Sequence, residues 1–67
     1  MNKDAELMFE LCDQAAKTYG TMLLGALINE AQGVDATALH AAANSMLDNL
    51  KNQVKLAVKV RGNEQAN

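Results

Sequence analysis

The stretch Gly33-Val34-Asp35 divides the 67-residue chain into two halves and decides how it folds. Glycine readily adopts the left-handed backbone conformation that follows a helix, so Gly33 is a helix stop signal. Asp35 is a favourable N-cap for a second helix. Val34, before the cap, and Leu39, at the fourth helical position, have the spacing of a hydrophobic staple. The stretch therefore predicts two helices joined by a turn at residues 33–35.

The residues before the turn follow a helical period, which predicts a first helix over about residues 4–32. At ~100° per residue, the apolar side chains gather on one broad face. The opposite face is polar and consists of Glu6, Glu10, Asp13 and Lys17. Gly20 and Gly25 each cost roughly 1 kcal/mol relative to alanine in a helix. The apolar stripe keeps its phase across both glycines, so we expect one continuous helix.

The residues after the turn predict a second helix over about 36–60, followed by a polar, frayed tail over residues 61–67. The connection is short, which makes the two helices antiparallel neighbours in a helical hairpin. Acidic residues early in the first helix and lysines late in the second then lie at the same end. The chain is expected to be a single all-α domain.

The hairpin is expected to be incomplete on its own, because one partner helix cannot cover its apolar surface. The first helix has an apolar stripe about 160° wide, against roughly 100° for an ordinary surface helix. Domains this small usually need a disulfide, a metal ion or oligomerisation to be stable. The chain has one cysteine, Cys12, and one histidine, His40, so it cannot form an internal disulfide or a four-ligand zinc site. We therefore expect two copies to pair as a four-helix bundle. The expected dimer core is Met8, Leu11, Ala15, Tyr19, Met22, Leu23, Leu39, Met46, Leu50 and Val54.

No set of residues has the pattern of an active site, a metal site or a cofactor site. His40 has no serine or cysteine at a helical spacing and is expected to be a partly exposed side chain near the turn. Cys12 falls on the apolar stripe and is expected to be a small buried residue. Glu6 and Glu10 form a carboxylate pair on a solvated face. We therefore expect a protein that is not an enzyme and needs no cofactor.

Charge and hydropathy limit the possible binding partners and the cellular location. The net charge is −2, which provides no overall attraction to nucleic acid or to an acidic membrane. No apolar run approaches the roughly 20 residues of a membrane span. The charged start of the chain leads directly into a helical pattern and does not resemble a signal peptide. These features predict a cytoplasmic protein.

Two surface features are candidate binding sites. Leu24 and Ile28, four residues apart on the first helix, are adjacent on its surface, and Leu7 and Leu56 also fall outside the main stripes. These four residues are the expected contacts with a partner protein, although they could instead be a second layer of the dimer. Lys51, Lys55 and Lys59, with Arg61 beyond them, form a basic row that could follow phosphates. The other interpretation is a solvated face or ion pairs within the bundle, which charge rows on helices usually form.

The size, the missing chemistry and the surplus apolar surface favour a small protein-interaction module such as a regulator, inhibitor, adaptor or chaperone. Small bacterial and bacteriophage regulators often have this form. The first alternative is an RNA- or DNA-binding hairpin dimer that uses the basic row. The second alternative is a structural subunit that repeats its contact. The partner and the relative direction of the two hairpins stay open.

Overall fold

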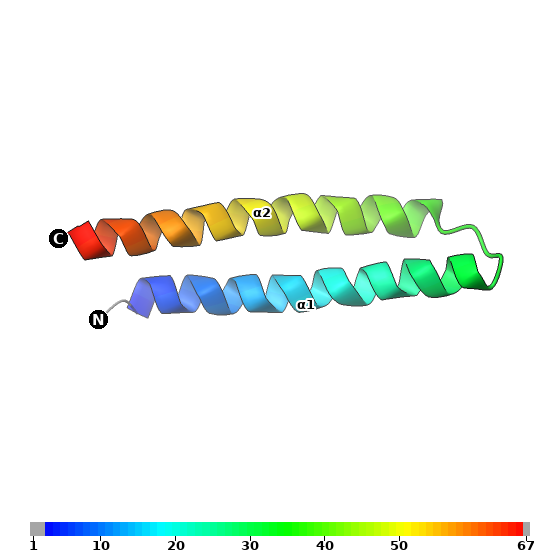
Figure 1. The fold of residues 1–67 in the computed structure, drawn as a ribbon, viewed down its shortest axis with the longest axis horizontal. Helices are drawn as coiled ribbons and strands as arrows, with labels where there is room; N and C mark the ends of the chain where they lie inside the picture. The colour runs from blue at the N-terminus through cyan, green and yellow to red at the C-terminus, as the bar shows by residue number, and fades with distance from the viewer. Residues whose placement is uncertain (1–2, 67) are drawn as a thin grey trace.

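The structure, a computed structural model, describes the backbone of residues 3–66 and the side chains of residues 3–63. Helix α1 spans Lys3–Ala31 and helix α2 spans Thr37–Ala66. The two helices lie side by side and run in opposite directions, so both ends of the chain are at the same end of the molecule (Figure 1). The predicted all-helical hairpin is confirmed.

The turn that ends α1 has the hydrogen bonds of a Schellman motif. Gly33 has a φ angle of 76°, in the left-handed region. The Gly33 N–H donates to the Glu30 carbonyl at 3.0 Å, and the Val34 N–H donates to the Asn29 carbonyl at 2.8 Å. These bonds satisfy carbonyls that the end of a helix leaves without partners. The predicted stop at Gly33 is confirmed.

Asp35 caps the start of α2. Its carboxylate Oδ1 accepts a hydrogen bond from the Thr37 N–H at 2.9 Å and a second from the Thr37 hydroxyl at 2.7 Å. The first backbone bond of the helix runs from the His40 N–H to the Ala36 carbonyl at 2.9 Å. Asp35 therefore caps α2 with its side chain as predicted, but from one residue before the N-cap position, which this first bond assigns to Ala36.

Helix α1 continues without a break through Gly20 and Gly25, as the phase of the apolar stripe predicted. A Cβ atom at either glycine would meet no other atom within 4 Å. Neither glycine is therefore required by close packing within the hairpin.

Helix α2 does not end at Val60 as expected but continues to Ala66. The guanidinium of Arg61 lies over the Phe9 ring of α1, 4.2 Å from its centroid. This cation–π contact attaches the extra turns to α1 and gives a physical reason for the longer helix. Asn67, the last residue of the expected tail, lies outside the described residues.

The contact line between the helices consists of small side chains, and we call it the seam. The buried residues are Ala5, Cys12 and Ala26 on α1 and Ala36, Ala43 and Ala57 on α2. On each helix they are seven residues apart, except for one interval of fourteen residues in which a larger residue occupies the middle position. Those two larger residues, Tyr19 and Leu50, are half-buried. Because α2 is the only element that can cover α1, the two series face each other, and their short side chains let the helices approach closely.

Candidate interaction surfaces

The seam divides the hairpin into two broad sides. Residues three and four positions after a seam residue flank it on opposite sides. Glu30 contacts His40, and Phe9 contacts Arg61. Each of these four residues lies four positions after a seam residue, so all four are on the same side. The residues that follow by three lie on the other side, where Met22 and Leu39 line one pocket.

The side that holds the residues four positions after a seam residue is called the charged side. Polar contacts join the two helices at both of its ends. Near the turn, Nε2 of His40 makes a short contact with Oε1 of Glu30. At the far end, Arg61 stacks on Phe9. Residues one position after a seam residue also lie on this side, and they include Glu6, Asp13 and Lys51. It is therefore a surface whose polar groups are arranged for contact with water and with each other.

The opposite side is the uncharged side, made of residues three and six positions after each seam residue. Within residues 3–63, none of these positions holds a charged side chain, and the charges at the margins of this side are Asp4, Lys17 and Asp35. Its large apolar members are Met8, Leu11, Met22, Leu39, Met46, Leu56 and Val60. On the charged side, by contrast, charged side chains lie between the large apolar residues, which are Phe9, Leu23, Leu27, Leu47, Val54 and Val58.

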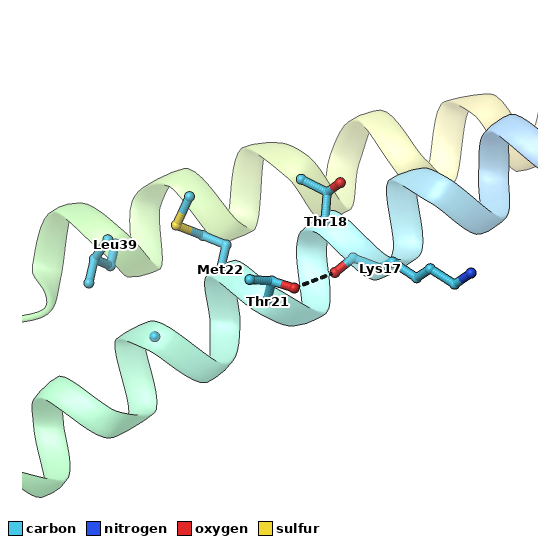
Figure 2. A pocket seen from close by; sticks show the side chains of 6 residues that line it. Lys17, Thr18, Thr21, Met22 and Leu39 are labelled. Atoms are coloured by element: carbon cyan, nitrogen blue, oxygen red, sulfur yellow. Dashed lines mark hydrogen bonds between the residues drawn. The ribbon is translucent and has the colours of Figure 1, made fainter.

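An open pocket of about 400 Å³ lies on the uncharged side near the middle of α1. Met22 reaches from α1 toward α2, and Leu39 lies beside it on the facing helix (Figure 2). Lys17 borders the pocket, but its ammonium group points away from Met22 and Leu39 (Figure 2). Gly25 also borders the pocket and has no side chain to fill it. The pocket can therefore accept an apolar side chain from outside the hairpin.

The residues expected in the dimer core occupy three different places. Tyr19 and Leu50 lie in the seam, whereas Leu23 and Val54 lie on the charged side. The other six lie on the uncharged side: Met8, Leu11, Ala15, Met22, Leu39 and Met46. All ten are half-buried except Leu11 and Val54, which are 49% and 39% exposed. Within one hairpin, none of them is fully covered.

The four residues expected to contact a partner protein do not form one patch. Leu24 and Ile28 are neighbours on the outer surface of α1 and are 57% and 47% exposed, and we call them the outer patch. Leu7 is also exposed, but it lies seventeen residues earlier, about 25 Å along the helix. Leu56 is on α2, at the edge of the uncharged side.

The basic row is exposed along its whole length. Lys51, Lys55 and Lys59 wind from the charged side to the outer surface of α2. Arg61 is exposed as well, but its guanidinium is held on Phe9. The acidic start of α1 lies at the same end of the hairpin as this row (Figure 1). Among the described side chains, however, these acids and lysines form no ion pair across the helices.

The side chains that could take part in catalysis or metal binding are engaged in structural contacts. Cys12 is 7% exposed in the seam, the small buried residue that the pattern predicted. His40 has a partner, Glu30, that spacing along one helix did not reveal, because the turn brings it from the other helix. Asp13 forms an exposed ion pair with Lys17 at 3.1 Å.

Metal-binding clusters and membrane-spanning helices are both absent from the described part of the chain. It contains no group of three or more His, Cys, Asp or Glu side chains arranged to hold a metal ion. Neither helix, within that part, is long and apolar enough to cross a membrane.

Comparison with known proteins finds no significant match to a protein-family model, a curated protein or a solved structure.

Proposed function

We propose that this chain is a small, non-enzymatic protein-interaction module that acts in the cytoplasm as a homodimer. It docks an apolar helix surface on a partner protein, as a regulator, inhibitor, adaptor or chaperone does. One observation carries the proposal. The side chains buried in the seam are alanines and one cysteine, whereas nine large apolar side chains are at least 39% exposed.

The energetics of folding support this proposal. Burying a large apolar side chain contributes about 1.5–3 kcal/mol, and an alanine contributes far less. Ordering the backbone costs roughly 1–2 kcal/mol for each residue. A hairpin that leaves most of its large apolar side chains half-buried or exposed has little to offset that cost. Further apolar burial, by a second copy and by a partner, is therefore part of how the protein works.

The outer patch is the proposed contact with the foreign partner. Leu24 and Ile28 point away from the seam and lie outside both broad sides, so a second copy on either side leaves them free. Two apolar side chains four residues apart are the anchors that a helix presents to an apolar groove. The partner surface is therefore expected to be an apolar groove that accepts one face of α1.

The test is affinity capture from the native host with Leu24→Asp and Ile28→Asp, compared with Ala41→Asp on the exposed surface of α2. Both outer-patch variants should lose a partner that the wild type and Ala41→Asp retain. All four proteins should keep the mass of the homodimer in light scattering. Dissociation of the homodimer by either outer-patch variant would show that these residues belong to the homotypic core instead.

The exposure of Lys51, Lys55 and Lys59 supports RNA or DNA binding as the alternative function. Binding through such a row weakens steeply as salt rises, because lysines release counterions from phosphates. A double variant, Lys55→Glu with Lys59→Glu, should then abolish a mobility shift with cellular RNA or DNA. The absence of any shift by the wild type at low salt would eliminate this alternative.

A further inference from the structure

We infer that the uncharged side is the surface on which a second copy of this chain packs, so that two hairpins form a four-helix bundle through it. This inference rests on the homodimer of the proposed function and names its interface. The charged side and the outer patch then face water or the foreign partner.

The geometry of the hairpin provides a second contact line on this side. In a four-helix bundle, each helix packs against two neighbouring helices. The directions to these two neighbours differ by about a right angle, and the core of the bundle lies between those directions. The seam faces the first neighbour, so side chains three positions after a seam residue point into the core. Met8, Met22, Leu39 and Met46 occupy such positions and are half-buried in one hairpin. A second copy would complete their burial.

Side chains six positions after a seam residue face the second neighbour. Leu11 on α1 and Leu56 on α2 hold such positions and are 49% and 51% exposed. Smaller side chains take other positions of the same series, including Thr18, Gly25 and Ala42. This mixture of large and small residues allows a second hairpin to approach and interdigitate.

The charge distribution favours a second copy as the occupant. In a two-fold symmetric dimer the same patch lies on both partners, so charges on it are buried against a copy of their own surface. In the described part of the chain, the uncharged side has charges only at its margins, from Asp4, Lys17 and Asp35. The charged side has Glu6, Asp13, Glu30, Lys51 and Arg61, and burying charged groups costs several kcal/mol for each ion before any pairing. Self-association through the uncharged side avoids that cost.

The area of the side also fits a second copy. The hairpin measures 54 × 15 × 11 Å, so its broad sides are the 54 × 15 Å faces. The Cα atoms alone outline a flat area of about 800 Å², and projecting side chains give the face a larger accessible surface, so it can provide the roughly 800 Å² that each partner buries in a standard stable interface. A second hairpin has the same length and width and covers this face from end to end.

The test uses two matched pairs of exposed apolar residues. Leu11→Glu with Leu56→Glu places charge on the uncharged side, at residues 49% and 51% exposed. Leu27→Glu with Val58→Glu places the same charge on the charged side, at residues 48% and 55% exposed. Wild type and the Leu27/Val58 variant should scatter light as two 7.2 kDa chains, and the Leu11/Leu56 variant as one chain or as an unfolded chain.

A mixing experiment keeps the inference testable even if the Leu11/Leu56 variant unfolds. A second variant has Leu11→Lys with Leu56→Lys. When the two loops lie at the same end of the bundle, each variant alone brings like charges together, whereas the mixture brings opposite charges together. The mixture should regain helical circular dichroism and the mass of two chains, which neither variant has alone.

Three outcomes would overturn the inference, and they separate it from the proposed function. Dissociation by the Leu27/Val58 pair, with the Leu11/Leu56 pair still dimeric, would leave the homodimer standing but on the other side. A monomeric, folded wild type would remove the homodimer altogether and leave the uncharged side to a foreign protein. Species that grow beyond a dimer with concentration would indicate an open assembly rather than a closed bundle.

Discussion

Ala43 shows how the hairpin is held together at the scale of single residues. It is 1% exposed in the seam, where only a short side chain fits between the helices. Ala41, two residues earlier, is exposed to solvent. The same substitution at these two positions therefore separates the effect of the seam from the effect of the residue type.

We expect Ala43→Leu to lower the free energy of unfolding by about 1–3 kcal/mol, because the larger side chain forces the helices apart. Ala41→Leu should change it by no more than about 0.5 kcal/mol. Urea unfolding at matched chain concentration measures both. Equal effects at the two positions would contradict a closely packed seam.

Asp35 gives the fold a dependence on pH. The hydrogen bonds from the Thr37 hydroxyl and the Thr37 N–H lower the pKa of its carboxyl below the usual 3.8. A carboxyl with a lower pKa in the folded state stabilises the fold above the unfolded pKa, and this contribution is lost as the pH falls through the folded value.

Asp35→Ala should therefore melt at a lower temperature than wild type near neutral pH. The difference should shrink as the pH falls below 3.8, because protonation weakens the cap of the wild type. Melting curves by circular dichroism at a series of pH values measure this difference. A constant difference across the acid range would show that the charged carboxylate is not what stabilises the cap.

At the scale of elements, two glycines differ in what they do. Gly33 needs its left-handed φ of 76° to end α1, whereas Gly20 lies inside a continuous helix. A Cβ atom would meet nothing within 4 Å at either position. The effect of alanine at each position is therefore a matter of backbone conformation alone.

Gly33→Ala should destabilise the protein by about 1–2 kcal/mol, because alanine is strained in the left-handed region. Gly20→Ala should stabilise it by up to about 1 kcal/mol, since alanine is the better helix former. Chemical denaturation of both variants at one chain concentration tests the opposite signs. A stabilising Gly33→Ala would show that the turn does not depend on the Schellman motif.

The turn and the two helices could be predicted from the sequence, because their signals are local. Gly33 and Asp35 determine the turn through their own backbone and side-chain chemistry, and the helical period is visible along each half. The small-residue seam was harder to identify, because hydropathy gives most weight to Leu and Met. The signal that could have indicated it was the spacing of alanines on α2, seven residues from Ala36 to Ala43 and fourteen from Ala43 to Ala57.

The contacts between elements depended on information that local patterns lack. Glu30 meets His40 because the turn sets the register, and Arg61 meets Phe9 because α2 continues beyond Val60. Of the candidate partner contacts, only Leu24 and Ile28 could be recognised as one patch, since both lie on one helix. Leu7 lies too far along α1 to join them, and Leu56 lies on α2, whose placement beside α1 depends on the turn and not on spacing along one helix.

At the scale of the whole molecule, stability and association are expected to be linked. If two hairpins share a core, unfolding separates two chains, so dilution favours the unfolded state. The melting temperature of the wild type should therefore rise with chain concentration. Melting followed by circular dichroism over a hundredfold range of concentration measures this, and an unchanged melting temperature would contradict a dimer that dissociates on unfolding.

The position of Cys12 makes the protein its own kinetic reporter. The thiol is closed between the helices at 7% exposure, and no second cysteine competes for a reagent. A thiol-specific label can reach it only when α1 and α2 separate. The labelling rate under native conditions, compared with that of the unfolded chain, therefore gives the free energy of opening the hairpin. A bound partner that holds the helices together would be detected as slower labelling, without any added probe.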